Sequence, residues 1–332
     1  MDQIPDGART VPTNYDTVYL RDHEPEAPDL RRLYENAKRD QWNVTTDIDW
    51  DQPVDLEGGF VADGLIDIHG TKFWDKLNKK EKGEMNRLFS AWRLSQLYHG
   101  EHGAVLVCGQ LANVLPTADA KYFMATQVMD EARHTEFFQR YLGERVGKVY
   151  DQAPAGKELF DFILSDPRWY IKTIGLQLVG ETFAVALFKM LSETAQDELL
   201  RYGCKMILRD EARHMGFGML SLPAQVREMD AQERQEMEEF TMYFLRNTLT
   251  GGFPKEAYLD MGFNKAEIAE IRELRKQKAQ SADSTMFRSL FKKEMHSTLV
   301  NNLHRCGVLS ESMKASLEQD LRVNVSEHLA AD

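Results

Sequence analysis

Apolar residues recur along most of this chain with the spacing of a helix. From about residue 78 to residue 223 they return every three or four positions, in long stretches that short polar breaks separate. Few runs show the alternation of apolar and polar residues that is typical of a strand. The pattern therefore predicts an all-α protein whose helices each bury one face.

Capping signals divide this stretch into four long helices. Asn78 followed by Glu81 is typical of a capping box at a helix start. Proline suits the first turn of a helix, and serine or threonine suits the position before it. On these signals the four helices begin at Asn78, Thr117, Pro167 and Ser192, and end near Pro116, Gly143, Leu191 and Pro223.

The polar segments around these helices predict how the chain is organised. The predicted divisions are residues 1–70, an N-terminal arm with a short helix at 30–43; residues 78–223, a four-helix bundle; and residues 224–332, accessory helices packed on the bundle. A further short helix is expected at 156–164, and a linker at 279–284. Together these segments predict a single domain with additional C-terminal helices.

Composition excludes several classes of protein. The 332 residues include 41 basic and 53 acidic side chains, a net charge of −12, which gives no general attraction to nucleic acid. The three cysteines, Cys108, Cys204 and Cys306, are far apart, which excludes a disulfide framework and a cysteine zinc site. No signal peptide and no membrane span is expected, so the cytoplasm is the predicted compartment.

One charged pentapeptide occurs twice. DEARH stands at residues 130–134 and again at 210–214, which is 80 positions later (210 − 130), and apolar residues surround both copies. A Gly-Glu pair also recurs, with Glu101 and Glu181 each 30 residues before the glutamate of the following copy (131 − 101 and 211 − 181). The chain therefore contains an internally duplicated helical hairpin.

The duplication predicts where these side chains lie. Pro116 is midway between Glu101 and Glu131, so the chain rises and returns to the same height. In each copy the second glutamate and the histidine are three residues apart and share one helix face. The six side chains expected at one level of the bundle are Glu101, Glu131, His134, Glu181, Glu211 and His214.

Four buried carboxylates at one level need positive charge, because desolvation and mutual repulsion disfavour their ionised form. Oxygen and imidazole donors without thiolate suit two iron ions, or a manganese–iron pair. A glutamate from each of two helices and a Glu-x-x-His pair from each of two others is the pattern of di-iron bundles. A purely structural polar repeat is the alternative, but a single Glu-x-x-His would fit that reading better than this matched set.

Residues 78–222, with both DEARH copies, resemble the ferritin-like di-iron carboxylate superfamily. Within it they are similar to bacterial multicomponent monooxygenase large subunits, acyl-carrier-protein desaturases and the ribonucleotide reductase small subunit, and residues 30–50 resemble the segment before the reductase bundle. The resemblance implies a ferritin-like four-helix bundle with the six residues as ligands. It also implies Asp130 and Asp210 as acceptors for the histidine N–H groups, with Arg133 and Arg213 in the same network.

Two positions differ from the reductase pattern. The first ligand is Glu101 where reductases commonly have aspartate, and Phe138 occupies the position of the radical tyrosine. A stable tyrosyl radical is therefore not expected there.

Residues on neighbouring turns are candidates for a substrate pocket, although each also fits plain core packing: Leu97, Val105, Cys108, Phe138, Gln177, Ala184, Val185, Phe188, Phe217 and Gly218. Gly218 in particular could give room to a substrate or let two helices pack closely.

The predicted function is that of an O2-dependent di-iron oxygenase or oxidase. It would hydroxylate, N-oxygenate or desaturate a small or carrier-bound substrate, with electrons from a reductase or ferredoxin. An iron-handling or peroxide-scavenging protein is one alternative, and a non-catalytic partner subunit is another. The resemblance also implies a homodimer.

Overall fold

The computed structural model describes residues 8–53, 59–249, 252–280 and 286–329. Throughout these residues the regular structure is helical, without any strand. The all-α prediction is therefore confirmed.

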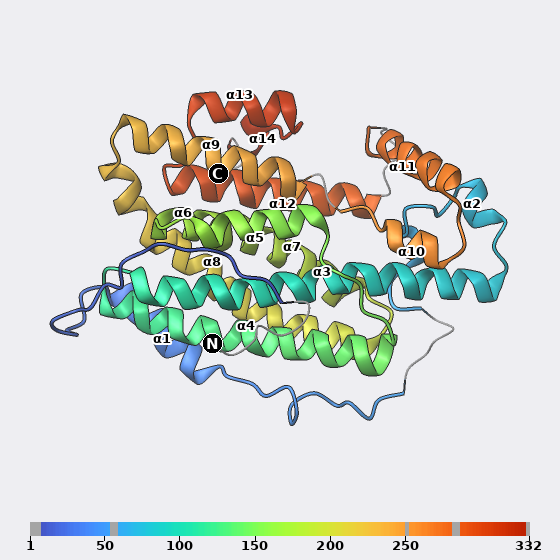
Figure 1. Ribbon diagram of the computed structural model, residues 1–332, viewed down its shortest axis with the longest axis horizontal. Coiled ribbons are helices and arrows are strands. Elements are labelled where there is room, and N and C mark those ends of the chain that lie inside the picture. The colour runs from blue at the N-terminus through green and yellow to red at the C-terminus, as the bar shows by residue number, and fades with distance from the viewer. Residues whose placement is uncertain (1–7, 54–58, 250–251, 281–285, 330–332) are drawn as a thin grey trace.

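Four long helices form the centre of the molecule (Figure 1). They are α3 (Lys79–Val114), α4 (Ala118–Tyr141), α7 (Glu181–Thr194) and α8 (Glu198–Glu228). Helix α3 packs along α4 and α7 packs along α8, so both predicted hairpins form. Contacts between α4 and α8 join the two hairpins.

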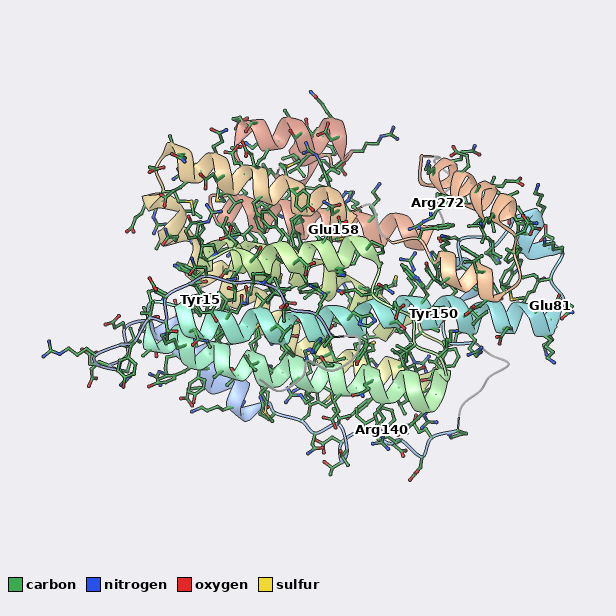
Figure 2. All side chains as sticks on the ribbon, in the orientation of Figure 1. Tyr15, Glu81, Arg140, Tyr150, Glu158 and Arg272 are labelled. Atoms are coloured by element: carbon green, nitrogen blue, oxygen red, sulfur yellow. The ribbon has the colours of Figure 1, made fainter. Side chains whose placement is uncertain are left out.

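The predicted helix starts are correct in the first hairpin and wrong in the second. Asn78 and Glu81 exchange the two hydrogen bonds of a capping box, and Thr117 caps α4; Figure 2 shows Glu81 at one end of the molecule. Ser192, predicted to cap the fourth helix, lies in the last turn of α7 and donates its hydroxyl to a backbone carbonyl three residues earlier. Asp197 caps α8 instead, because its carboxylate accepts from the N–H three residues on.

Two prolines also act differently from the prediction. Pro167 lies two residues before α6 (Trp169–Thr173) rather than in its first turn. Helix α8 continues through Pro223 to Glu228. Val226, just beyond the proline, is buried, and packing of this kind outweighs the one backbone hydrogen bond that a proline removes.

The predicted third helix is continuous in path but not in hydrogen bonding. A π-helical segment, η3 (Ile174–Gly180), joins α6 to α7, and the Glu181 N–H bonds to the carbonyl of Leu176, five residues back. Such turns are rare and often mark functional sites. The whole segment Trp169–Thr194 is long and apolar enough to cross a membrane, but it is mostly buried among other helices, as a core helix of a bundle is.

Shorter elements from the N-terminal half of the chain pack around the bundle. Helix α1 (Pro28–Arg39) packs against α4 and α8. Its bounds are close to those of the helix predicted at 30–43, and α5 (Pro154–Ser165) contains the helix predicted at 156–164. The sequence did not predict three short elements: a 3₁₀ turn η1 (Asp63–Leu65), α2 (Lys72–Asp75) and a π-helical turn η2 (Leu142–Val146).

The C-terminal third forms further helices. These are α9 (Ala231–Leu249), α10 (Lys255–Asp260), α11 (Lys265–Gln280), α12 (Met286–Arg305), α13 (Glu311–Asp320) and α14 (Val325–Leu329). Helix α12 packs on α7, α8 and η3, and α9 packs on η3 and α5, on the side of the bundle away from α1 (Figure 1). The predicted linker at 279–284 falls mostly outside the described residues.

Buried apolar side chains gather at the two ends of the bundle. The first apolar cluster includes Val107, Phe123 and Phe217, near the turn of the first hairpin. The second apolar cluster includes Phe137 and Phe188, towards the turn of the second hairpin. The repeated glutamates and histidines lie between these clusters, away from bulk water.

Candidate metal centre

The six side chains of the repeat meet in the layer between the two clusters. Glu101 comes from α3, Glu131 and His134 from α4, Glu181 from α7, and Glu211 and His214 from α8. None of the six is more than 6% exposed. The predicted meeting of two hairpins at one level is therefore what the structure has.

The six side chains form two groups of four. The first group is Glu101, Glu131, His134 and Glu211, and the second is Glu131, Glu181, Glu211 and His214; within each group the candidate ligand atoms all lie within 4.8 Å of one another. Glu131 and Glu211 belong to both groups. That arrangement is the one expected of two neighbouring cation positions with two shared carboxylates.

Each imidazole turns its Nδ1 atom towards the carboxylates. His134 Nδ1 lies 3.3 Å from a Glu101 oxygen and 3.2 Å from a Glu211 oxygen. His214 Nδ1 lies 2.9 Å from a Glu211 oxygen and 3.2 Å from a Glu131 oxygen. The Nδ1 atoms are therefore the nitrogens that point to the centre of the layer.

The opposite nitrogens bond to the two aspartates of the repeat, and they do so crosswise. His134 Nε2 lies 3.1 Å from Asp210, and His214 Nε2 lies 3.2 Å from Asp130. Each aspartate thus serves the histidine of the other DEARH copy. Because a carboxylate only accepts hydrogen bonds, Nε2 carries a hydrogen, and Nδ1 is the nitrogen whose lone pair an ion would take when it replaces the proton there.

Two arginines bind this aspartate pair from outside. Arg133 donates to both Asp130 and Asp210, and Arg213 also contacts both carboxylates. All four side chains are buried. Two guanidinium groups balance two carboxylates, as burial of charge requires.

Sequence reasoning missed two residues of this network. The indole N–H of Trp42 donates to Asp210 at 2.8 Å, and its ring stacks on His134 with 6.4 Å between ring centroids. Gln41 donates to Asp130 and accepts from Arg133. Both residues lie just after α1, where only the resemblance of residues 30–50 to a reductase segment pointed to a role.

Sequence reasoning also missed a buried amide beside the carboxylates. Gln127 stands one turn before Glu131 on α4, and its Nε2 lies 3.0 Å from both Glu131 and Glu181. Its Oε1 lies 3.3 Å from Nε2 of Gln177, a residue of η3. The one-turn spacing from Glu131 was the available signal, because residues four apart share a helix face.

Burial and charge together set the protonation of the layer. Burial raises the pKa of both Glu101 and Glu181 well above its ordinary value. Burial acts the same way on Glu131, but the His214 charge and the imidazole hydrogen bonds outweigh it and lower its pKa. Burial opposes protonation of His134 and His214, yet the surrounding carboxylates raise both pKa values well above the ordinary range. Protons on the imidazoles thus balance the carboxylates, a role that cations take over on binding.

The donor set fits a pair of transition-metal ions. Four carboxylates and two imidazoles, without thiolate, suit iron and manganese. Oε1 of Glu211 is buried and makes no hydrogen bond, and the atom that faces it is His134 Nδ1 at 3.2 Å, so both atoms are left for a cation between them. The side chains present therefore agree with the di-metal prediction.

The predicted pocket residues divide between the two ends of the bundle. Cys108 and Phe217 belong to the first apolar cluster, whereas Leu97, Phe138, Ala184 and Phe188 belong to or pack against the second. A Cβ atom on Gly218 would lie 3.0 Å from Cβ of Gln177, so this glycine serves close packing rather than open space. A substrate role for these residues, and for Val105 and Val185, stays a prediction.

A helical bundle with two buried Glu-x-x-His pairs and two further glutamates defines a ferritin-like di-metal carboxylate protein. The profile of the family described as "P-aminobenzoate N-oxygenase AurF" matches residues 25–295, and the chain belongs to this family. The protein is therefore a di-iron oxygenase, as the sequence predicted.

Solved structures have the same fold. The chain is similar to an R2-like ligand-binding oxidase with aerobically reconstituted metal cofactor after photoconversion, at 19% identity over 86% of this chain and 94% of that chain, with a TM-score of 0.51. It is also similar to a mutant of the R2-like ligand-binding oxidase with aerobically reconstituted Mn/Fe cofactor, at 18% identity over 88% and 99%, with a TM-score of 0.53. No curated protein matches the chain.

Proposed function

We propose that this protein uses O2 to oxygenate the amino nitrogen of a small arylamine. The observation that carries the proposal is the family match over residues 25–295, because the family's description is the N-oxygenation of p-aminobenzoate. Among the three reactions that the sequence left open, the match favours N-oxygenation over hydroxylation of carbon and desaturation. The first oxidation would be R–NH2 + O2 + 2 e⁻ + 2 H⁺ → R–NHOH + H2O.

The proposed metal ligands are the six side chains of the central layer: Glu101, Glu131, His134, Glu181, Glu211 and His214. The bound metal pair would supply the place where O2 is reduced. Asp130 and Asp210 would fix the orientation of the two imidazoles, and the arginines would balance their charge. Two irons are the proposed occupants, with a manganese–iron pair as the alternative.

The reaction implies partners. Two electrons must enter from outside the protein, so we propose a reductase or a ferredoxin as donor. We also propose that the protein is a homodimer in the cytoplasm. Each protomer would be a single domain, in which residues 1–70 and 224–332 pack on the bundle at 78–223. Mass measurement by light scattering tests the dimer.

Metal content of single variants tests the ligands. Purified parent protein should bind about two irons per chain, as di-iron bundles do. Glu131→Ala and Glu211→Ala should lose both ions because these residues belong to both groups. Glu101→Ala and Glu181→Ala should each keep about one. Parent protein that takes up no added ferrous iron would contradict the assignment.

Oxygen uptake tests the function. Reduced, iron-loaded protein given 4-aminobenzoate should consume O2 and form the hydroxylamine, which mass spectrometry detects as a gain of one oxygen. Iron loading far beyond two per chain, with no amine-dependent O2 uptake, would instead favour the iron-handling alternative. Glu131→Ala protein is the matched control, because it should lack the metal pair; circular dichroism checks that it keeps the fold.

A further inference from the structure

A chain of two buried amides runs from the metal layer towards the first apolar cluster. Gln127 lies against Glu131 and Glu181, and Gln177 lies behind Gln127. Both side chains are fully buried. Every amide group has one oxygen and one NH2, so the direction of each can be worked out from its neighbours.

The carboxylates fix the direction of the whole chain. A carboxylate that holds a metal ion offers only acceptor oxygens, so the NH2 of Gln127 faces Glu131 and Glu181 and its oxygen faces Gln177. The NH2 of Gln177 must then face Gln127. Reversing Gln127 would set its oxygen against the carboxylates, and reversing Gln177 would set its oxygen against that of Gln127. The oxygen of Gln177 therefore points away from Gln127, as a hydrogen-bond acceptor.

That acceptor has no partner in the protein. Oε1 of Gln177 is buried and makes no hydrogen bond, although nearly all buried polar atoms are paired. Leaving a buried acceptor unpaired destabilises a fold. Local structure nevertheless holds the side chain there: Gln177 lies in the π-helical η3, and Gly218 lets its Cβ approach α8 closely.

We propose that the Gln177 oxygen accepts an N–H from the substrate's amino group and so fixes which way the nitrogen faces. Gln177 stands four residues before Glu181, a ligand of the second metal position. That position is the group of Glu131, Glu181, Glu211 and His214. Glu131 and Glu181 also accept the hydrogen bonds of Gln127. Neutral arylamines offer two N–H donors, and an acceptor selects for them. The inference rests on the proposed function and names a substrate-positioning residue for it.

The test compares two ligands that differ only in hydrogen bonding. 4-Aminobenzoate and 4-methylbenzoate have nearly the same shape, but the methyl group cannot donate. Isothermal titration gives a Kd for each ligand with metal-loaded wild-type protein and with Gln177→Met. This variant keeps the side-chain length and removes the acceptor together with the N–H that donates to Gln127, so the comparison of the two ligands isolates the loss of the acceptor. Gln110→Met is the matched control, because Gln110 bonds to Lys172 away from the metal layer.

Wild-type protein should bind the amine more tightly than the methyl compound. Gln177→Met should weaken amine binding by about 5- to 100-fold, the range for loss of one buried hydrogen bond. The Kd of the methyl compound should change by less than about twofold in Gln177→Met, and Gln110→Met should leave the Kd of both ligands unchanged. With the amine as substrate, Gln177→Met should also raise KM and lower kcat, because the nitrogen is no longer held in place.

Three results would overturn the inference, and they can be told apart. Equal weakening of both ligands would mean that Gln177 only shapes the site. If wild-type protein oxygenates the amine but binds it no more tightly than the methyl compound, the role of Gln177 is removed and the proposed function stands. This comparison uses wild-type protein alone, so it does not depend on whether a variant folds. Wild-type protein that neither binds nor oxygenates any arylamine would remove both.

Discussion

The crossed pairing of aspartates and histidines makes a prediction that the repeat alone would reverse. Asp130 and His134 are four residues apart on one helix, so sequence spacing pairs them within one copy. The structure instead pairs Asp130 with His214. Asp130→Asn should therefore weaken metal binding mainly through His214.

The size of the effect follows from the neighbours of Asp130. Gln41, Arg133, Arg213 and His214 all donate to this carboxylate. An asparagine NH2 would face a donor whichever way the amide turns, and a buried positive charge would be left unbalanced. Loss of such a contact behind a metal-bound histidine typically weakens metal affinity about 10- to 100-fold, which is about 1.4–2.7 kcal/mol.

A double-mutant cycle measures this pairing. Ferrous iron affinity is determined by competition with a chelator for Asp130→Asn in three backgrounds: wild type, His214→Ala and His134→Ala. The effect should be nearly lost in the His214→Ala background, where the imidazole is already absent, and kept in the His134→Ala background. The opposite pattern would refute the crossed arrangement. Thermal unfolding of each metal-free variant controls for loss of fold.

The remaining predictions concern stability. Gly203→Ala should destabilise the fold by about 2 kcal/mol, because the new Cβ would lie 2.0 Å from the buried Phe137 ring and overpacking outweighs the helix preference of alanine. Gly109→Ala, with no atom within 4 Å of the new Cβ, should stabilise it by about 1 kcal/mol. Thermal unfolding measures both variants, and midpoints that move in the same direction would contradict this contrast. Burial, with Lys292 and His328 adding, lowers the pKa of His296 from 6.5 to about 4. The unfolded chain therefore binds more protons between those pH values, and stability falls as pH drops through them. His296→Gln should remove about 2 kcal/mol of the loss that urea unfolding shows between pH 7 and pH 5.

The sequence predicted the parts of this protein that repeat or periodicity controls. Four helices, the hairpin duplication and the meeting of the six side chains all follow from spacing along the chain. Ser192 and Pro223 were misread because a cap or a stop signal is weak compared with the packing around it. The π-helical η3 leaves no mark in the apolar pattern, since one extra residue per turn changes the pattern little.

Contacts between distant segments could not be predicted from spacing. Trp42 reaches Asp210 across 168 positions of sequence, and the two aspartates cross between copies. Gln177 was noticed as the one polar residue among the pocket candidates, but its partner Gln127 was not. These contacts depend on how the two hairpins rotate about each other, and helix periodicity does not set that angle.

The crossed pairing also means that neither half of the duplication is self-sufficient. A single hairpin holds a glutamate, a Glu-x-x-His pair and an aspartate, but that aspartate is aimed at an imidazole on the other hairpin. One hairpin alone could complete the layer only by associating with a second copy of itself around a two-fold axis, each lending its aspartate to the other. Covalent fusion of the two copies removes the need for self-association and lets them diverge. The segment after α1 departs from that two-fold arrangement, because Trp42 donates to Asp210 whereas Gln41 donates to Asp130.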